Sequence, residues 1–138
     1  MAATDFWINL PVKDVARAKA FFSALGFTFN AHYGDRPDSA SLLLGNKGIV
    51  LMLFEEAAFA GFCGNAVADT TKGNEILISF DASSREEVDE VLRQAEAAGG
   101  TIYGKPSDQG WMYGGGFVDP DGHRWNVLHM DMSKMPSV

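Results

Sequence analysis

The strongest constraint on the fold of this chain is a run of five elements that occurs twice in 138 residues. Each run is a strand, a helix and three further strands, over residues 5–54 and again over residues 74–130. A unit that repeats in so short a chain indicates two similar modules. Because each module is rich in strands and carries a single helix, the predicted class is α+β. Each helix can cover only one face of its sheet, so pairing the two free faces would enclose a cavity.

The first module begins with a strand over residues 5–12, where apolar and polar side chains alternate. Asp14 then predicts a helix N-cap, because its carboxylate can accept a hydrogen bond from a free backbone N–H. Apolar residues follow at helical spacing as far as Gly26, a residue type that favours the end of a helix. Three more strands are expected, at 27–33, 40–44 and 49–54, the last two as a hairpin.

Residues 55–73 interrupt the pattern and form the predicted linker between the modules. Residues 55–62 suggest a short helix, and the small and polar residues after them suggest a loop. A loop of this length is also a candidate lid over a site.

The second module repeats the order of elements. Ser83 and Ser84 each precede a glutamate by three positions, so either serine fits the capping box of a helix N-terminus. The helical apolar stripe that follows ends at Gly99-Gly100, and residues 119–122, Asp-Pro-Asp-Gly, have the composition of a tight turn. The strands are expected at 75–81, 101–105, 112–118 and 123–130.

Charge and composition argue against several partners. The formal net charge is −7 and no cluster of lysines and arginines is present, so nucleic acid and anionic membranes are poor partners. No apolar run approaches the roughly 20 residues that span a bilayer, and a secretory signal is not evident. The single cysteine, Cys63, excludes an internal disulfide framework. We therefore expect a cytoplasmic protein.

Three segments resemble the vicinal oxygen chelate superfamily. They are Leu10-Pro-Val-Lys-Asp14, Phe21-Phe-Ser-Ala-Leu-Gly-Phe27 and Asp119-Pro-Asp-Gly122. This superfamily includes glyoxalase I, bleomycin-resistance proteins, extradiol dioxygenases and fosfomycin-resistance enzymes. The resemblance covers nearly the whole chain and implies one domain over residues 1–138, in which two βαβββ modules form a cavity lined by mixed β-sheet. It also implies a homodimer.

The metal-dependent members of this superfamily carry one metal ligand, usually His or Glu, on each of four strands. Matching the motifs places these positions at Trp7, Met52, Glu75 and Asn126. Glu75 is the only good ligand, since Asn126 offers a weak carbonyl oxygen and Met52 a soft thioether. The resemblance therefore implies a dismantled metal site and no cofactor. A divalent metal is the alternative, because a shift of one residue in strand register would turn every side chain of the strand to the opposite face.

The three histidines are not expected to restore a metal site. His129 follows Asn126 by an odd number of positions and should point to the opposite face of the strand. His123 lies at the turn, where exposure is expected. His32 is near the end of the second strand, away from the strands with ligand positions.

Strand alternation, together with the aromatic and glycine-rich run at 110–117, predicts a mainly apolar cavity with a few polar groups. The expected lining residues are Trp7, Asn9, Met52, Phe54, Leu77, Trp111, Tyr113 and Asn126. Such a lining is typical of a pocket for a small organic molecule. The alternative is a filled core, with Trp7 and Met52 in the space of the lost metal. Trp111 and Tyr113 would flank a flat ligand or, alternatively, pack beside a bulge.

Two functions of different classes remain open. The first is a glyoxalase/bleomycin-resistance/dioxygenase-like protein that binds a small organic molecule without a conventional metal centre and without turnover. The second is a metal-dependent lyase, isomerase or dioxygenase whose degenerate site uses Glu75. An inward-facing Glu75 would serve as a general acid or base, whereas an exposed carboxylate at a strand start is the other interpretation. A structural dimer with a closed core is a third possibility.

Overall fold

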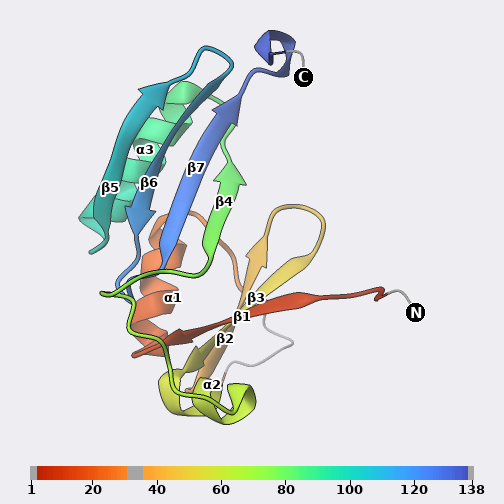
Figure 1. The fold of residues 1–138 in the computed structure, drawn as a ribbon, viewed down its shortest axis with the longest axis vertical. Coiled ribbons are helices and arrows are strands. Elements are labelled where there is room, and N and C mark those ends of the chain that lie inside the picture. Colours follow the sequence, from red (N-terminus) through yellow and green to blue (C-terminus); the bar gives the residue numbers. More distant parts are fainter. Residues whose placement is uncertain (1–2, 31–35, 137–138) are drawn as a thin grey trace. The chain divides into compact units, whose positions relative to one another are not determined.

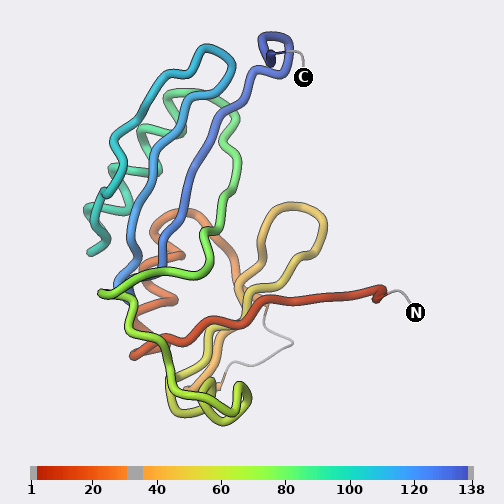
Figure 2. Tube along the Cα trace, in the orientation of Figure 1, coloured from red at the N-terminus to blue at the C-terminus, as the bar shows by residue number. Residues whose placement is uncertain are grey.

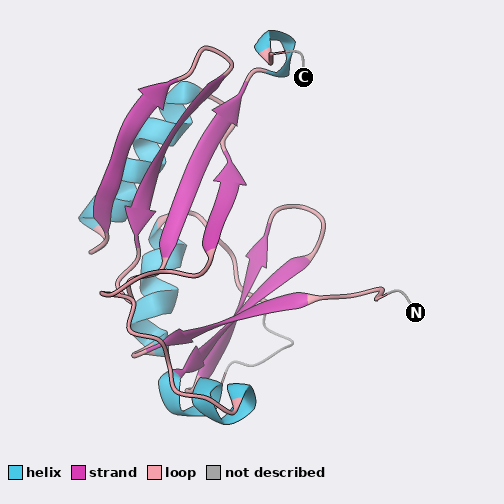
Figure 3. Ribbon diagram, in the orientation of Figure 1, coloured by secondary structure: helices cyan, strands magenta, loops and turns pink. Residues whose placement is uncertain are grey.

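The computed structural model describes residues 3–30 and 36–136. In these ranges it contains three α-helices, a 3₁₀ helix and seven strands, coloured by type in Figure 3. The chain divides into two compact units, Met1–Asp69 and Thr70–Val138, each with its own sheet. The predicted α+β class is confirmed.

The first unit has a three-stranded mixed sheet in the order β1-β3-β2. Its strands are β1 (Trp7–Val12), β2 (Ser39–Leu44) and β3 (Ile49–Glu55), with β1 parallel and β2 antiparallel to β3 (Figure 1). Helix α1 (Val15–Ala24) buries one side against β2 and β3. The Asp14 carboxylate accepts a hydrogen bond from the backbone N–H of Arg17 at 3.1 Å, which confirms the predicted N-cap.

Two further segments of this unit were expected from the sequence. The short helix is present as α2 (Glu56–Cys63) and ends at Gly64, which has a left-handed backbone. In the described residues 27–30, the strand expected at 27–33 is present as a single bridge between Phe29 and Leu42, flanked by two backbone hydrogen bonds. Residues 31–33 of that prediction lie outside the described residues.

The second unit has a four-stranded mixed sheet in the order β4-β7-β6-β5. Its strands are β4 (Leu77–Asp81), β5 (Thr101–Asp108), β6 (Met112–Val118) and β7 (Arg124–Met130). The trace in Figure 2 shows β5 and β6 joined as a hairpin. Helix α3 (Arg85–Ala97) packs on one face, and a 3₁₀ helix (Met132–Lys134) follows β7. None of the α-helices in the described ranges is long and apolar enough to cross a membrane.

One of the two possible caps of α3 forms. Ser84 is the N-cap, and its hydroxyl oxygen accepts a hydrogen bond from the backbone N–H of Glu87 at 3.1 Å. The Glu87 carboxylate reaches back to the backbone N–H and the hydroxyl of Ser83, at 3.1 and 3.0 Å. The Ser84–Glu87 register is therefore the one that forms, with the Glu87 carboxylate bound one residue earlier, at Ser83.

The turn between β6 and β7 is held by a buried carboxylate. Asp119 accepts hydrogen bonds from the backbone N–H groups of Asp121 and His123, at 2.9 and 3.0 Å, and from Nε1 of Trp125 at 3.1 Å. Burial raises the pKa of Asp119, and the nearby His123 opposes this change. The expectation of an exposed His123 is wrong, since its exposed fraction is 6 %. It is buried because the turn folds back, with the His123 carbonyl accepting a hydrogen bond from the Asp119 N–H.

Candidate functional site

Among the described residues of the second unit, one face of the sheet packs against α3 and the other carries no α-helix. In β7, Trp125 and Val127 are fully buried, as are Val88 and Ala95 of α3. Side chains alternate along a strand, so Arg124, Asn126 and Leu128 point to the other side. We call this other side the open face.

Tyr103 crosses the open face from β5 to β7. Its hydroxyl donates a hydrogen bond to the side-chain oxygen of Asn126 at 2.5 Å. Gly116 of β6 lies between them, next to Asn126 in the strand register. A Cβ atom at Gly116 would lie 2.3 Å from Cζ of Tyr103, so the ring occupies the space that a side chain there would need. Burial raises the pKa of Tyr103. A phenol is already protonated at neutral pH, so the hydroxyl can donate this hydrogen bond.

The guanidinium of Arg124 stands over the Tyr103 ring. Its guanidinium carbon is 4.5 Å from the ring centroid, which is the geometry of a cation–π contact. Within the described part of the chain, the Arg124 guanidinium has this contact and no side-chain hydrogen bond or ion pair. The open face therefore holds a guanidinium that has no acidic partner among the described residues.

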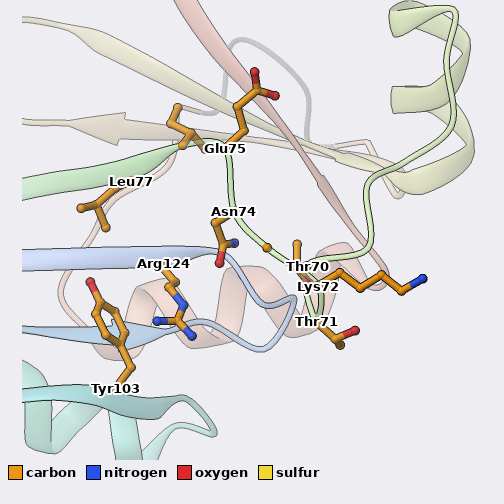
Figure 4. A pocket seen from close by; sticks show the side chains of 10 residues that line it. Thr70, Thr71, Lys72, Asn74, Glu75, Leu77, Tyr103 and Arg124 are labelled. Atoms are coloured by element: carbon orange, nitrogen blue, oxygen red, sulfur yellow. The ribbon is translucent and has the colours of Figure 1, made fainter.

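Two pockets lie on this face, and Tyr103 lines both. The larger, about 520 Å³, is formed by residues 70–77 together with Tyr103 and Arg124 (Figure 4). The smaller, about 220 Å³, has Gly114 and Gly116 in its floor and Asn126 and Leu128 in its wall. A Cβ atom at Gly114 would lie 2.4 Å from the Leu128 side chain, so a larger residue at this position would clash with Leu128.

The 70–77 wall of the larger pocket is fixed to the turn between β6 and β7. Thr70 donates a hydrogen bond from Oγ1 to the carbonyl of Asp121, and Asn74 donates from Nδ2 to the carbonyl of Gly122, both at 2.9 Å. Gly122 has a φ of 87°, and a Cβ atom there would lie 2.1 Å from Oγ1 of Thr70. The end of the predicted linker therefore forms part of a pocket in the second unit.

Three of the predicted site residues line the two pockets of the second unit, and a fourth, Trp111, does not. Leu77 lines the larger pocket and Asn126 the smaller. Glu75 also lines the larger pocket, but it is exposed, it precedes β4, and its carboxylate points away from Arg124 in Figure 4. Trp111 precedes β6 and lines neither pocket; its carbonyl accepts a hydrogen bond from the Asp131 N–H.

Tyr113 is on the opposite face from Asn126. Its hydroxyl donates a hydrogen bond to the carboxylate of Asp89 in α3 at 2.6 Å. The guanidinium of Arg85 stands over its ring, 5.0 Å from the centroid. Tyr113 thus joins the helix to the sheet instead of lining either pocket.

The other predicted lining residues share one face of the first unit's sheet. Trp7, Asn9, Met52 and Phe54 point away from the buried positions Leu10, Leu51 and Leu53. Trp7 is exposed to 60 %, and Phe54 makes an edge contact with Phe62 of α2. Since Trp7 is not buried, it does not fill a closed core within this unit.

The residues at the four family positions do not fit a metal ion. Trp7 offers no ligand atom and Met52 only a thioether, while the side-chain oxygen of Asn126 already accepts the Tyr103 hydrogen bond. No group of three or more His, Cys, Asp or Glu side chains in the described ranges is placed to hold a metal. His129 faces away from Asn126, as predicted, with Nδ1 3.0 Å from the carbonyl oxygen of Ala82. His32 lies outside the described residues.

Sequence reasoning missed Tyr103 and Arg124. Arg124 was detectable in principle, because it precedes Asn126 by two positions and so shares its face. Tyr103 was not, because its contact depends on the pairing of three strands and on a glycine in the middle one.

Comparison with known proteins identifies the family. Residues 6–127 match the profile of the Glyoxalase/Bleomycin resistance protein/Dioxygenase superfamily. The solved hypothetical protein SA1046 from S. aureus is 28 % identical, with 94 % of this chain and 95 % of that chain covered and a TM-score of 0.81. A glyoxalase/bleomycin resistance protein/dioxygenase family enzyme from Burkholderia phytofirmans PsJN is 20 % identical, with coverages of 90 % and 96 % and a TM-score of 0.77.

A genomically encoded fosfomycin resistance protein, FosX, from Listeria monocytogenes has the same fold. It is 21 % identical, with 97 % of this chain and 98 % of that chain covered and a TM-score of 0.66. No curated protein matches the chain. The profile match spans most of the sequence and confirms the family expected from the motifs. The chain belongs to the glyoxalase/bleomycin resistance protein/dioxygenase superfamily.

Proposed function

We propose that the protein binds a small organic molecule on the open face of the second unit, without a conventional metal centre. The observation that supports this most is the hydrogen bond from Tyr103 to Asn126 across Gly116. It holds an aromatic ring and an amide beside two pockets. It also occupies one of the two lone pairs of the oxygen with which Asn126 would bind a metal.

The chemistry of the two pockets suits an organic ligand. Gly114 and Gly116 let a flat group approach the backbone of β6, with Leu128 and Met112 as apolar neighbours. The same pocket is also lined by polar side chains, among them Tyr103, Gln109 and Asn126, which can set the orientation of a ligand. The larger pocket, at about 520 Å³, is within the range of small-molecule sites.

The family also contains metal-binding members, but the four family positions of this chain provide few metal ligands. FosX from Listeria monocytogenes has been solved in complex with Mn(II) and sulfate. In the present chain the four family positions provide an indole, a thioether, an exposed carboxylate and an engaged amide. A set with one carboxylate is too poor in N and O donors for tight binding of a divalent ion.

Titration with Mn(II) tests the metal-free part. Protein labelled with ¹⁵N and purified without a metal-affinity tag is first analysed for its metal content. We expect well under one metal per chain and no selective paramagnetic broadening of the Glu75 and Asn126 amide signals. A content near one per chain, with broadening centred on these two residues, contradicts this part of the proposal.

Titration with phenol, benzamide and benzoate tests the binding part by the same NMR spectra. We expect at least one probe to shift the amide signals of Gly114, Gly116 and Tyr103 selectively, and to be recovered unchanged. If none of the three shifts these signals at saturating concentration, the open face is not a small-molecule site. The expected homodimer remains a separate prediction, which sedimentation equilibrium tests directly.

A further inference from the structure

We propose that the bound molecule is a small organic carboxylate and that Arg124 binds its carboxylate group. This inference rests on the proposed function, because it names the chemical class of the ligand for the same open face. Three features of the described residues support it: the setting of Arg124, the donors of Asn126 and the local charge.

The contact with Tyr103 leaves the N–H donors of Arg124 available to an anion. A guanidinium that stands over an aromatic ring keeps its N–H donors available for a further partner. The Arg124 guanidinium has no hydrogen bond or ion pair within the described part of the chain. In Figure 4 the guanidinium lies among the residues of the larger pocket, and the Glu75 carboxylate points away from it. The cation is therefore placed in the pocket without an acidic partner.

Asn126 adds further donors to the same face. Its side-chain oxygen accepts the Tyr103 hydrogen bond, so its NH₂ group is the part left for a ligand. Arg124 and Asn126 are two positions apart on β7, which separates their Cα atoms by about 7 Å on one face. Together they present more N–H donors than acceptors. A carboxylate, which only accepts hydrogen bonds, complements such a pair better than a neutral amide, which brings donors of its own.

The charge around the two pockets is opposite to that of the whole chain. The chain has 11 Lys and Arg against 18 Asp and Glu, and a net charge of −7. The two pockets are lined by the three cations Lys72, Lys105 and Arg124 and by the single carboxylate of Glu75. A local excess of positive charge in an acidic protein favours an anionic ligand at this face.

The planar fork of arginine favours a carboxylate. Guanidinium and carboxylate are both planar and pair through two parallel hydrogen bonds. A phosphate monoester carries more charge and three terminal oxygens, which call for more donors than one guanidinium and one amide provide. The apolar part of a carboxylate would lie against Tyr103 and Leu77, which border the same pocket.

Matched probes test the inference. NMR titrations measure the dissociation constants of benzoate, of its neutral analogue benzamide and of phenyl phosphate. We expect benzoate to bind about tenfold more tightly than benzamide, a difference of ~1.4 kcal/mol. Arg124→Gln should remove this preference, so that benzoate binds no more tightly than benzamide. Arg124→Lys should retain part of it, because lysine keeps the charge but not the fork.

Arg93→Gln is the matched control, because it removes an exposed arginine of α3 that is paired with Glu90. This variant should keep the preference for benzoate. The ratio of benzoate to benzamide affinity reports charge recognition, which a general loss of structure would not change selectively. Raising the salt concentration of the wild-type protein should weaken benzoate more than benzamide, and this measurement needs no variant.

The possible results separate the two proposals. If benzoate and benzamide shift the Gly114 and Gly116 signals with equal affinity, the site binds organic molecules but the carboxylate inference is overturned. Tighter binding of phenyl phosphate than of benzoate overturns it as well. If no probe shifts these signals, both the inference and the proposed function fail.

Discussion

The hydroxyl of Tyr103 and the side-chain oxygen of Asn126 lie 2.5 Å apart, although a whole strand separates the two residues. Tyr103 belongs to β5 and Asn126 to β7, and the ring passes over β6 at Gly116. This contact ties three of the four strands of the sheet together on the open face. It also sets the positions of the groups that we propose for ligand binding.

Gly116→Ala should break this contact. A methyl group there would lie 2.3 Å from Cζ of Tyr103, so the ring must move away from Asn126. Loss of the hydrogen bond should lower the free energy of unfolding by about 1 kcal/mol, measured by urea denaturation. Gly73→Ala is the control, because a Cβ atom at Gly73 meets nothing within 4 Å. Equal stability of the two variants would show that the contact contributes little.

The two tyrosines of this unit offer a matched test of which face binds the ligand. Tyr103→Phe removes the partner of Asn126 and should weaken benzoate binding about threefold, the effect of one neutral hydrogen bond. Tyr113→Phe removes the bond to Asp89 on the opposite face and should leave benzoate affinity unchanged. NMR titration of both variants measures this difference. Weaker binding in Tyr113→Phe alone would mean that the ligand sits on the other face.

The sequence predicted the parts of the fold that depend on local hydrogen bonds. Asp14 and Ser84 cap helices because a side chain and a backbone N–H three positions later meet whenever the helix forms. Alternation along β7 likewise placed Asn126 and His129 on opposite faces. These relationships lie within one element, so they can be read from spacing alone.

The remainder of the candidate site depends on pairing between elements. The β5–β6 register shifts on either side of Gly104, so spacing along β5 does not predict where Tyr103 lies. Glu75 was expected to open a strand, but β4 begins at Leu77 and leaves Glu75 exposed. His123 is buried because the turn closes on Asp119, a contact that the turn composition did not specify.

Asp119→Ala should be the most destabilising of the variants considered. It leaves two backbone N–H groups and the indole N–H of Trp125 without their acceptor in a buried turn. Each unsatisfied buried donor costs about 1–3 kcal/mol, so a total near 3 kcal/mol is a conservative expectation. Urea denaturation measures it, with the exposed Asp81→Ala of β4 as the control. If Asp119→Ala lowers the free energy of unfolding no more than the control does, the hydrogen bonds of Asp119 contribute little to stability.

The pair of Arg85 and Asp108 predicts a pH dependence. The Arg85 side chain, and next the Gly110 N–H, hydrogen-bond the Asp108 carboxylate and lower its pKa to about 2. A carboxyl whose pKa is lower in the folded state stabilises the fold above its unfolded pKa of about 3.9. This contribution is lost as the pH falls through about 2. In Arg85→Gln the Asp108 pKa, followed by ¹³C NMR of the carboxyl, should rise part of the way back. An unchanged pKa would mean that Arg85 does not bind Asp108 in solution.

Glu75→Gln separates the binding protein from the enzyme that uses Glu75. The carboxylate is exposed and lines the same pocket as Arg124 and Lys72. Its removal should leave the fold intact and strengthen benzoate binding by no more than about fivefold, because exposed charge pairs contribute at most ~1 kcal/mol.

A turnover assay decides between the two functions for this variant. Wild type, Glu75→Gln and the control Glu96→Gln are each incubated with benzoate, benzamide and fosfomycin, and products are sought by mass spectrometry. A binding protein should return all three molecules unchanged in every case. Product formed by wild type and by Glu96→Gln but not by Glu75→Gln would assign Glu75 to a catalytic step. Because the Glu75 carboxylate is exposed and points away from Arg124, we expect no product.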